Sequence, residues 1–270
     1  MSRRWRLINP EVNNGFYNMA VDEAMFIACR EGVVPPTLRF YTWSPPCVSI
    51  GYFQKVNRAF STPPPDKEIV RRITGGRAVF HGKDLSYSIV CNTGNSAFPN
   101  NILGTYHVIT AAFITGLEYL GITPDPLNTQ PDSPRKINYR RSQLRSGRPN
   151  MEYYRSPLCF AMTLGHEITV DGQKLIGSAQ RRWPDVFLQH GSILMTGSLQ
   201  ENGSNSISLS EVLKDRFNAD KIIPALCAGF KKTLGITLVE ECLSQYELDL
   251  VGSLVEEKYS RASWNFRRLR

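Results

Sequence analysis

The sequence has no apolar run that could cross a lipid bilayer. Across 270 residues, no stretch of about 18 consecutive apolar side chains occurs, so no membrane span is expected. The first ten residues, MSRRWRLINP, are basic, but the apolar segment of a secretory signal does not follow them. These absences predict a cytoplasmic protein with no membrane partner.

Cysteine is present but never in a paired motif. None of the six cysteines forms a CxxC pair, and none has the spacing of a zinc site. Because no export signal is predicted, the thiols are expected to stay reduced rather than to form disulfides. The sequence therefore predicts no structural metal. The cysteines are Cys29, Cys47, Cys91, Cys159, Cys227 and Cys242.

A segment with two adjacent glycines, RRITGGRAVFHG at residues 71–82, lacks the parts of two nucleotide-binding loops. No Lys-Ser or Lys-Thr pair follows the glycines, which excludes a P-loop. The third glycine of a dinucleotide-binding fingerprint is also missing. Because glycines let a ligand approach the backbone closely, residues 71–82, hereafter the glycine segment, are predicted to bind another kind of ligand.

The charge balance is basic, with a formal net charge of +8 and a pI of about 9.2. Such a protein can meet nucleic acid, a membrane surface or an acidic protein. Much of the excess falls in one stretch, which is either a solvated basic loop or a docking patch for an acidic protein. No nucleic-acid-binding motif accompanies it, so nucleic acid is not expected as a partner. The stretch contains Arg135, Lys136, Arg140, Arg141, Arg145 and Arg148.

Hydrophobic periodicity predicts alternating helices and short strands. Apolar residues at three- and four-residue steps predict helices over 14–30 and 105–121, and helical segments after about 207. Alternating residues on both sides of Asp171-Gly172 predict a hairpin over 166–182. Further strands are expected at 37–43, 47–53, 69–73, 85–91 and 186–195. The strands on either side of the two glycines are expected to form a tight hairpin.

Hairpins outnumber strand–helix–strand crossovers in this order of elements. That predominance predicts an α+β fold, with mixed or antiparallel sheets flanked by helices. No linker interrupts the pattern, so residues 1–270 are predicted to form a single domain. Its catalytic core is expected at about 14–207, with a helical C-terminal tail at about 208–270 packed on it.

Two reactive side chains flank the predicted hairpin turn. Cys159 lies before it in SPLCFAM, and Lys174 follows it in DGQKLIG. A single cysteine is often a small buried apolar residue, and a lysine after a turn is often solvated, so neither is decisive alone. Three small residues at 177–179 indicate either a weak strand segment or a place where a ligand approaches the backbone. His81 and His190 are either ligand contacts or ordinary hydrogen-bonded histidines.

In combination, these segments resemble the lipoate/biotin protein ligase and octanoyltransferase superfamily. The matching order is RRITGGRAVFH, a cysteine, DGQKLIGSAQRR and LQHGSIL, preceded by NMAVDEAMF and RFYTWSPPCVSIGYFQ. The resemblance extends over about residues 14–195 and implies the catalytic-domain fold of the biotin/lipoate protein ligases. One difference is that Gly82 follows His81, where the superfamily commonly has an aspartate; Asp84 comes two positions later.

A cysteine before the hairpin is typical of the branch that takes octanoate from acyl carrier protein. The resemblance implies that Cys159 forms an acyl-thioester, and that Lys174 lowers the pKa of the thiol and positions the acyl carbonyl. It implies transfer from octanoyl-acyl carrier protein to a lysine of a lipoyl-domain protein, without a cofactor. The implied substrate-binding residues are Arg72, Gly75, Gly76, Arg77, His81, Gly177, Ser178, Ala179, Gln180, His190 and Gly191.

Elementary thiol chemistry agrees with this reaction. The thiolate is the nucleophile, and a free cysteine has a pKa of about 8.5, so little of it is ionised at pH 7. A nearby ammonium favours the thiolate. Transfer of an acyl group from one thiol to another is close to isoenergetic and needs no ATP, whereas the later conversion of the thioester to an amide is downhill.

Three other functions stay open. An ATP-dependent lipoate or octanoate ligase shares the glycine segment, but such ligases need no nucleophilic cysteine. They also usually carry a C-terminal accessory domain, whereas only about 75 residues follow LQHGSIL here. An octanoyl amidotransferase between lipoyl-domain proteins shares the cysteine and the lysine, although the intact glycine segment favours the carrier-protein-dependent branch. A non-enzymatic module would bind an acyl group or an acidic protein without turnover. The expected assembly is a monomer.

Overall fold

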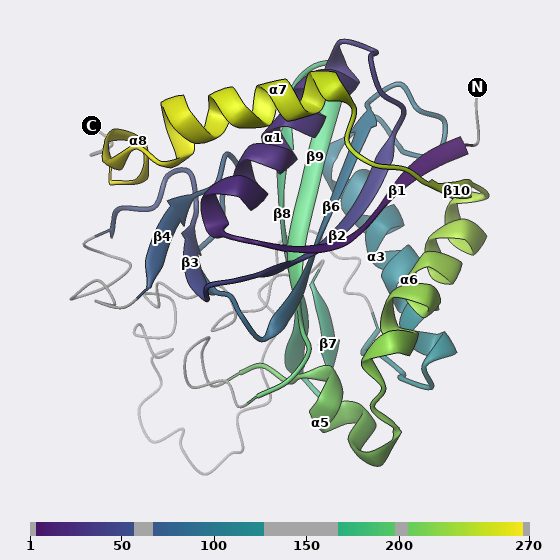
Figure 1. Cartoon of the computed structure of the whole chain (residues 1–270). Coiled ribbons are helices and arrows are strands. Elements are labelled where there is room, and N and C mark those ends of the chain that lie inside the picture. The colour runs from purple at the N-terminus through teal and green to yellow at the C-terminus, as the bar shows by residue number, and fades with distance from the viewer. Residues whose placement is uncertain (1–3, 57–66, 127–166, 198–204, 267–270) are drawn as a thin grey trace, which may run out of the picture.

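Two β-sheets form the centre of the computed structural model, which describes residues 4–56, 67–126, 167–197 and 205–266 (Figure 1). Among these residues the larger sheet has seven strands and the smaller sheet has three. The larger sheet contains, in spatial order, β10 (Thr237–Glu240), β1 (Arg4–Asn13), β2 (Thr37–Trp43), β6 (Asp84–Asn92), β9 (Val186–Leu194), β8 (Gln173–Arg182) and β7 (Ile168–Val170). The smaller sheet contains β4 (Glu68–Arg71), β3 (Cys47–Ile50) and β5 (Val79–Phe80).

Helices cover both faces of the larger sheet (Figure 1). On one face, α3 (Ile102–Tyr119) packs with α6 (Ala219–Leu234); on the other, α1 (Gly15–Arg30) lies between the sheet and α7 (Gln245–Leu254). Both sheets combine parallel and antiparallel pairs, so the predicted α+β class with mixed sheets flanked by helices is confirmed. The shorter helical segments are α5 (Leu209–Leu213), η2 (Lys214–Arg216), η3 (Val255–Tyr259) and α8 (Ala262–Asn265).

Alternation along β2 explains why the sheet has two apolar cores. Leu38 and Phe40 belong to the cluster beneath α3 and α6, whereas Tyr41 and Trp43 belong to the cluster beneath α1. The C-terminal helices contribute to both clusters, with Phe230 on the first side and Tyr259 on the second. In the part of the chain that the structure describes, no helix is long and apolar enough to cross a membrane.

The hairpin predicted over 166–182 is present. Asp171 and Gly172 have φ angles of +51° and +75°, both positive as a type I′ turn requires, and they join β7 to β8. The helices predicted at 14–30 and 105–121 correspond to α1 and α3. The second begins earlier than predicted, at Ile102, because the side chain of Asn101 accepts a hydrogen bond from the Gly104 N–H and caps the helix.

Three strands, β1, β5 and β10, were not predicted from the sequence. β1 pairs in parallel with β2 on one side and with β10 on the other, with Arg6 opposite Thr37 and Arg4 opposite Thr237. Charged residues and Pro10 weaken the alternation of β1, so its conformation is decided by partners remote in sequence. The helical segments predicted after 207 are present as α5, α6 and α7, but β10 interrupts them.

The tight hairpin predicted around the two glycines is wrong. The strands predicted at 69–73 and 85–91 correspond to β4 and β6, which belong to different sheets and do not pair with each other. β5, a short strand within the glycine segment, does not pair with β4 either, because β3 lies between them. Residues 72–78 therefore connect the two edges of the smaller sheet. A Cβ built on Gly76 would lie 3.7 Å from the Cβ of Ala179, so this connection faces β8 of the larger sheet.

Candidate active site

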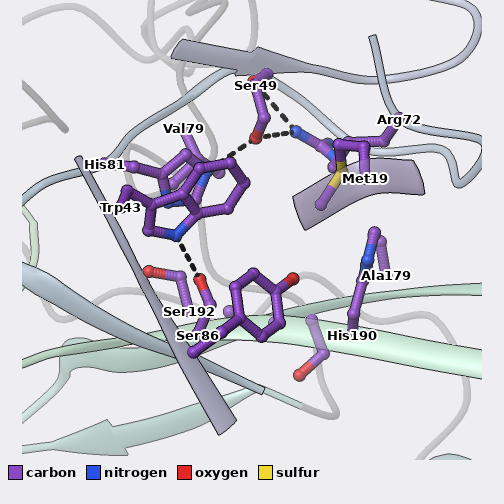
Figure 2. Close-up of a pocket in the computed structure, with 15 residues that line it drawn as sticks. Met19, Trp43, Ser49, Arg72, Val79, His81, Ser86, Ala179, His190 and Ser192 are labelled. Atoms are coloured by element: carbon purple, nitrogen blue, oxygen red, sulfur yellow. Dashed lines mark hydrogen bonds between the residues drawn. The ribbon is translucent and has the colours of Figure 1, made fainter. Parts of the chain in front are cut away.

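A pocket lies between the two sheets (Figure 2). The larger sheet contributes residues of β2, β6, β8 and β9, and α1, β3, β5 and the glycine segment supply the rest of the wall. Among the described residues, most of those predicted to bind substrate come together here, but Gly75, Arg77 and Gln180 are not part of the lining. The predicted residues that do line the pocket are Arg72, Gly76, His81, Gly177, Ser178, Ala179, His190 and Gly191.

Sequence reasoning missed several residues of the wall. All except Ser86 lie in segments that carried the superfamily resemblance, so those segments were informative, but nothing in them showed which side chains face inward. Orientation toward the pocket depends on how the two sheets meet, which no local pattern reveals. The missed residues are Met19, Tyr41, Trp43, Ser49, Val79, Ser86 and Ser192.

Asp84 organises one part of the wall. Its carboxylate accepts hydrogen bonds from Nδ1 of His81 at 2.8 Å and from the hydroxyls of Ser86 and Ser192 at 3.0 and 2.7 Å. Burial alone raises the pKa of Asp84, but the interactions with His81 and Ser192 outweigh burial and hold the pKa below 3.8. A carboxylate therefore lies beside His81 although position 82 is a glycine. Because Asp84 is ionised, Nδ1 of His81 carries a hydrogen.

A second buried carboxylate, Asp22 of α1, holds His190. It accepts hydrogen bonds from Nδ1 of His190 at 2.7 Å and from the Arg39 guanidinium at 2.9 Å. Burial raises the pKa of Asp22, but the hydrogen bond from His190 and the charge of Arg39 outweigh it and keep the pKa below 3.8. Burial lowers the pKa of His190 below 6.5, which Asp22 only partly offsets. His190 is therefore neutral at pH 7, and its Nε2 accepts from the hydroxyl of Thr74 at 2.6 Å.

The side chain of Arg72 shapes the glycine segment. One guanidinium nitrogen donates to the carbonyl and hydroxyl oxygens of Ser49 at 2.9 and 2.7 Å. The other donates to the carbonyls of Gly75 and Arg77, both at 3.0 Å. These bonds fix the backbone on both sides of Gly76. They identify Arg72 as a positioning residue, whatever contact it also makes with a ligand.

The polar groups of the wall are directed into the protein rather than into the pocket. The hydrogens of His81, Ser86 and Ser192 are bound to Asp84, and Nε1 of Trp43 donates to Ser86 Oγ at 2.9 Å. The indole of Trp43 stacks on the His81 ring, with centroids 3.9 Å apart and planes 17° apart (Figure 2). The pocket therefore offers ring faces and carbon atoms, which favour an apolar chain over a charged group.

The family model for the lipoyl protein ligase A/B catalytic domain matches residues 14–231, a range that includes every residue lining the pocket. The chain belongs to the lipoyl protein ligase A/B family. Octanoyltransferase LipM from Geobacillus kaustophilus is 34% identical to it, in an alignment that covers 98% of both chains. Octanoyltransferase LipM from Bacillus anthracis is 31% identical over 98% of this chain and 99% of its own.

Solved structures of lipoate protein ligases have the same fold. A putative lipoate protein ligase from T. acidophilum with bound lipoic acid superposes with a TM-score of 0.74 at 23% identity, over 98% of this chain and 100% of that one. Lipoate-protein ligase A bound with ATP superposes with a TM-score of 0.75 at 23% identity, over 100% of both chains. The catalytic-domain fold implied by the sequence resemblance is confirmed.

Lys174 of this family member is buried, not solvated as a lysine after a turn usually is. Its side chain is 0% exposed, and Nζ donates to the carboxylate of Glu167, which is also buried. A buried ion pair requires close contact between the two charges to offset their loss of hydration. The sequence analysis did not identify Glu167 as the ion-pair partner of Lys174. Nothing in the local sequence indicates that an acidic residue in the predicted hairpin forms an ion pair across the turn.

Burial makes four described cysteines of this family member poor nucleophiles. It raises the pKa of Cys29 to about 12 and that of Cys227 to about 11. It also raises the pKa values of Cys47 and Cys91 well above 9.0. Such thiols are protonated at neutral pH, whereas the thiolate is the reactive form. Cys159, the predicted nucleophile, lies outside the described residues.

Proposed function

We propose that this chain transfers an octanoyl group from octanoyl-acyl carrier protein to a lysine of a lipoyl-domain protein, the first step of lipoate biosynthesis. The observation that carries the proposal is the nearly full-length alignment, at 34% and 31% identity, with two proteins named octanoyltransferase LipM. The apolar wall of the pocket supports it, because an eight-carbon acyl chain has no charge to satisfy. The proposal places the enzyme in the cytoplasm as a monomer without a cofactor.

The proposed reaction has two steps on Cys159. The thiolate of Cys159 attacks the carbonyl carbon of the octanoyl thioester, and the thiolate of the carrier protein leaves and takes up a proton. The ε-amine of the acceptor lysine then attacks the new thioester and gives up a proton. An amide forms, and the Cys159 thiolate leaves. Lys174 is proposed to favour the Cys159 thiolate and to position the acyl carbonyl.

The pocket is proposed to hold the octanoyl chain during both steps. The backbone of Gly76 and the small residues at 177–179 would contact the chain, and the stacked rings of Trp43 and His81 would add a flat apolar surface. Gly75, Arg77 and Gln180, which are not part of the pocket lining, remain predicted contacts with another part of the donor or acceptor.

Intact-mass analysis tests the reaction and separates it from the alternatives. After exposure to octanoyl-acyl carrier protein, the protein should gain the mass of one octanoyl group, and hydroxylamine should remove it. Parallel mixtures with free octanoate, ATP and magnesium test a ligase, and octanoyl-loaded lipoyl-domain protein as donor tests an amidotransferase. Pyrophosphate release that depends on free octanoate, without the mass gain, would identify a ligase and overturn the proposal.

Residues 135–148, which lie outside the described residues, are proposed to attract the acidic carrier protein. Neutralising Arg140, Arg141 and Arg145 to glutamine should raise the apparent KM for octanoyl-acyl carrier protein at low salt, because electrostatic attraction mainly accelerates association. The difference in KM from wild type should shrink as salt is added, because ions at 0.1 M largely screen exposed charges that are more than about 10 Å apart. Steady-state kinetics at two salt concentrations measure both effects. An unchanged KM at low salt would refute a docking role.

Substitution of Gly51 should distort the pocket from outside. A Cβ at this position would lie 2.0 Å from the carbonyl oxygen of Gly76, so alanine must push the glycine segment away. Misplacement of a reacting group by about 1 Å can lower the catalytic rate by roughly 100-fold. Gly51→Ala should therefore lower kcat/KM for octanoyl transfer by roughly 10- to 100-fold. Overpacking should also lower the free energy of unfolding by about 1–3 kcal/mol.

Gly252→Ala is the matched control. Gly252 lies in α7, and a Cβ there would meet no atom within 4 Å. Because alanine is favoured over glycine in helices by roughly 0.5–1 kcal/mol, this variant should be as stable as wild type or more stable. Its kcat/KM should be that of wild type. If Gly51→Ala also transfers octanoate at the wild-type rate, the contact with Gly76 does not shape the site.

A further inference from the structure

The C-terminal end of the described chain contacts the strand that leads into the glycine segment. Helix α8 packs against β4, as Figure 1 shows. Nε1 of Trp264 donates to the carbonyl of Arg71 at 2.9 Å, and the side-chain oxygen of Asn265 accepts from the Arg71 N–H at 2.9 Å. Two side chains therefore bind the backbone N–H and carbonyl of Arg71, and both come from a segment that is almost 200 residues further along the chain.

The side chain of Arg71 extends this contact inward. Its guanidinium is fully buried and donates to the carbonyls of Trp264 and Asn265 at 3.1 and 2.9 Å. It also donates to the carbonyls of Gly51, Tyr52 and Gln54 at 2.9, 3.1 and 2.7 Å. Charge-assisted hydrogen bonds of this kind are stronger than neutral ones. Arg71 therefore ties the C-terminal segment to a turn at residues 51–54.

The turn at 51–54 in turn supports the pocket. The N–H of Tyr52 donates to the carbonyl of Thr74 at 2.7 Å, and the hydroxyl of Thr74 binds His190 in the pocket wall. The backbone of Gly51 lies so close to Gly76 that no side chain fits between them. Movement of the turn would therefore shift both the glycine segment and the support of His190.

The ring of Tyr52 provides a second connection. It meets the Trp264 ring edge-on, with centroids 5.9 Å apart, and the Arg181 guanidinium lies 5.4 Å from its centroid. Arg181 belongs to β8, the strand that supplies Ala179 to the pocket. The C-terminal segment thus contacts, through one aromatic ring, the strand on the side of the pocket opposite the glycine segment.

We infer that residues 259–265 form a positioning element for the pocket, acting through Arg71 and the turn at 51–54. Asn265 is the central side chain of this element, because it binds the Arg71 N–H with its oxygen and donates to the Tyr259 carbonyl at 2.6 Å with its nitrogen. The kinetic consequence rests on the proposed octanoyl transfer, but the structural consequence does not.

Asn265→Ala should loosen the pocket without unfolding the protein. Removing the acceptor of a buried N–H should speed hydrogen exchange at residues 71–77 by about 5- to 10-fold. Exchange in β6, at the centre of the larger sheet, should stay at the wild-type rate and serves as the internal reference. The KM for octanoyl-acyl carrier protein should rise by a similar factor, while the mass of the acyl adduct stays the same.

Ser244→Ala is the matched control in the helical region that precedes residues 259–265. Ser244 caps α7 through the Glu247 N–H, so its loss weakens the start of that helix without touching Arg71. It should change neither exchange at 71–77 nor the KM. Trp264→Phe keeps an aromatic ring but removes the donor to the Arg71 carbonyl. It provides a milder variant if Asn265→Ala does not fold, and it should show the same changes to a smaller degree.

The outcomes separate the two proposals. Wild-type exchange at 71–77 and wild-type KM in both Asn265→Ala and Trp264→Phe would overturn the positioning role. Equal effects from Ser244→Ala would also overturn it, because general loosening of the segment would then be sufficient. If the wild-type protein transfers no octanoate, the proposed function fails, but the exchange measurements still decide whether residues 259–265 hold the glycine segment.

Discussion

Replacing Cys159 with alanine should abolish octanoyl transfer. Loss of a catalytic nucleophile in acyl-transfer enzymes reduces kcat by up to about 10⁶-fold, and residual turnover from binding alone is far slower, so a loss of at least roughly 1,000-fold is expected. No octanoyl mass should appear on the variant after exposure to octanoyl-acyl carrier protein. The measurement is transfer to a lipoyl-domain protein under single-turnover conditions, together with intact-mass analysis of the enzyme.

Cys242→Ala is the matched control for this experiment. Cys242 is the exposed thiol among the described cysteines, so it is the one that could be acylated by simple accessibility, and it is not part of the pocket lining. The four buried thiols have raised pKa values and are protonated at neutral pH. Cys242→Ala should retain wild-type transfer. Full transfer by Cys159→Ala would exclude the two-step reaction and leave direct transfer or adenylate chemistry.

Replacing Asp22 with alanine should strongly destabilise the protein. Asp22 is 1% exposed and accepts from Arg39, which is also 1% exposed, from His190 and from the Tyr41 hydroxyl at 3.0 Å. Its removal leaves the Arg39 charge buried without its carboxylate, a situation that typically costs about 3–5 kcal/mol. Urea unfolding should show a lower midpoint with little change in the dependence on urea concentration.

Asp185→Ala separates this effect from the loss of an ordinary ion pair. Asp185 accepts from Arg30 at 3.2 Å, but the two side chains are 51% and 50% exposed. Solvent screens such a pair, so its removal should cost about 0–1 kcal/mol. If Asp22→Ala and Asp185→Ala lower the free energy of unfolding by similar amounts, burial of the Asp22 network contributes nothing to stability.

Local patterns were sufficient for the elements whose stabilising partners are close in sequence. The Asp171-Gly172 turn demands positive φ angles, and the strands it joins pair with each other, so the hairpin could be predicted. The apolar periodicity of α1 and α3 was also sufficient for their prediction, although the Asn101 cap moved the start of α3. By contrast, β1 and β10 are strands because of partners on remote segments, and their own alternation is weak.

Some residues of the candidate site could be predicted from the sequence, and others could not. Arg72, Gly76, His81 and His190 could be assigned to a ligand site because the order of their segments resembles the superfamily, and all four line the pocket. The inward orientation of Met19 could not, since α1 is buried on more than one side. The same holds for the role of Arg71, whose acceptors lie on two segments about 20 and almost 200 residues away.

By itself, the sequence determined the family, the α+β class, the hairpin and the residue types available for acyl transfer, because each depends on short segments with their own chemistry. Only the tertiary structure decided that Asp84 binds His81, that Lys174 is buried against Glu167, and that the glycine segment connects the two edges of the smaller sheet rather than forming a hairpin. The physical reason is that burial, ion pairing and strand pairing depend on how the folded chain brings surfaces together. The residue types of a segment do not specify this, even where the two partners are only three or seven residues apart.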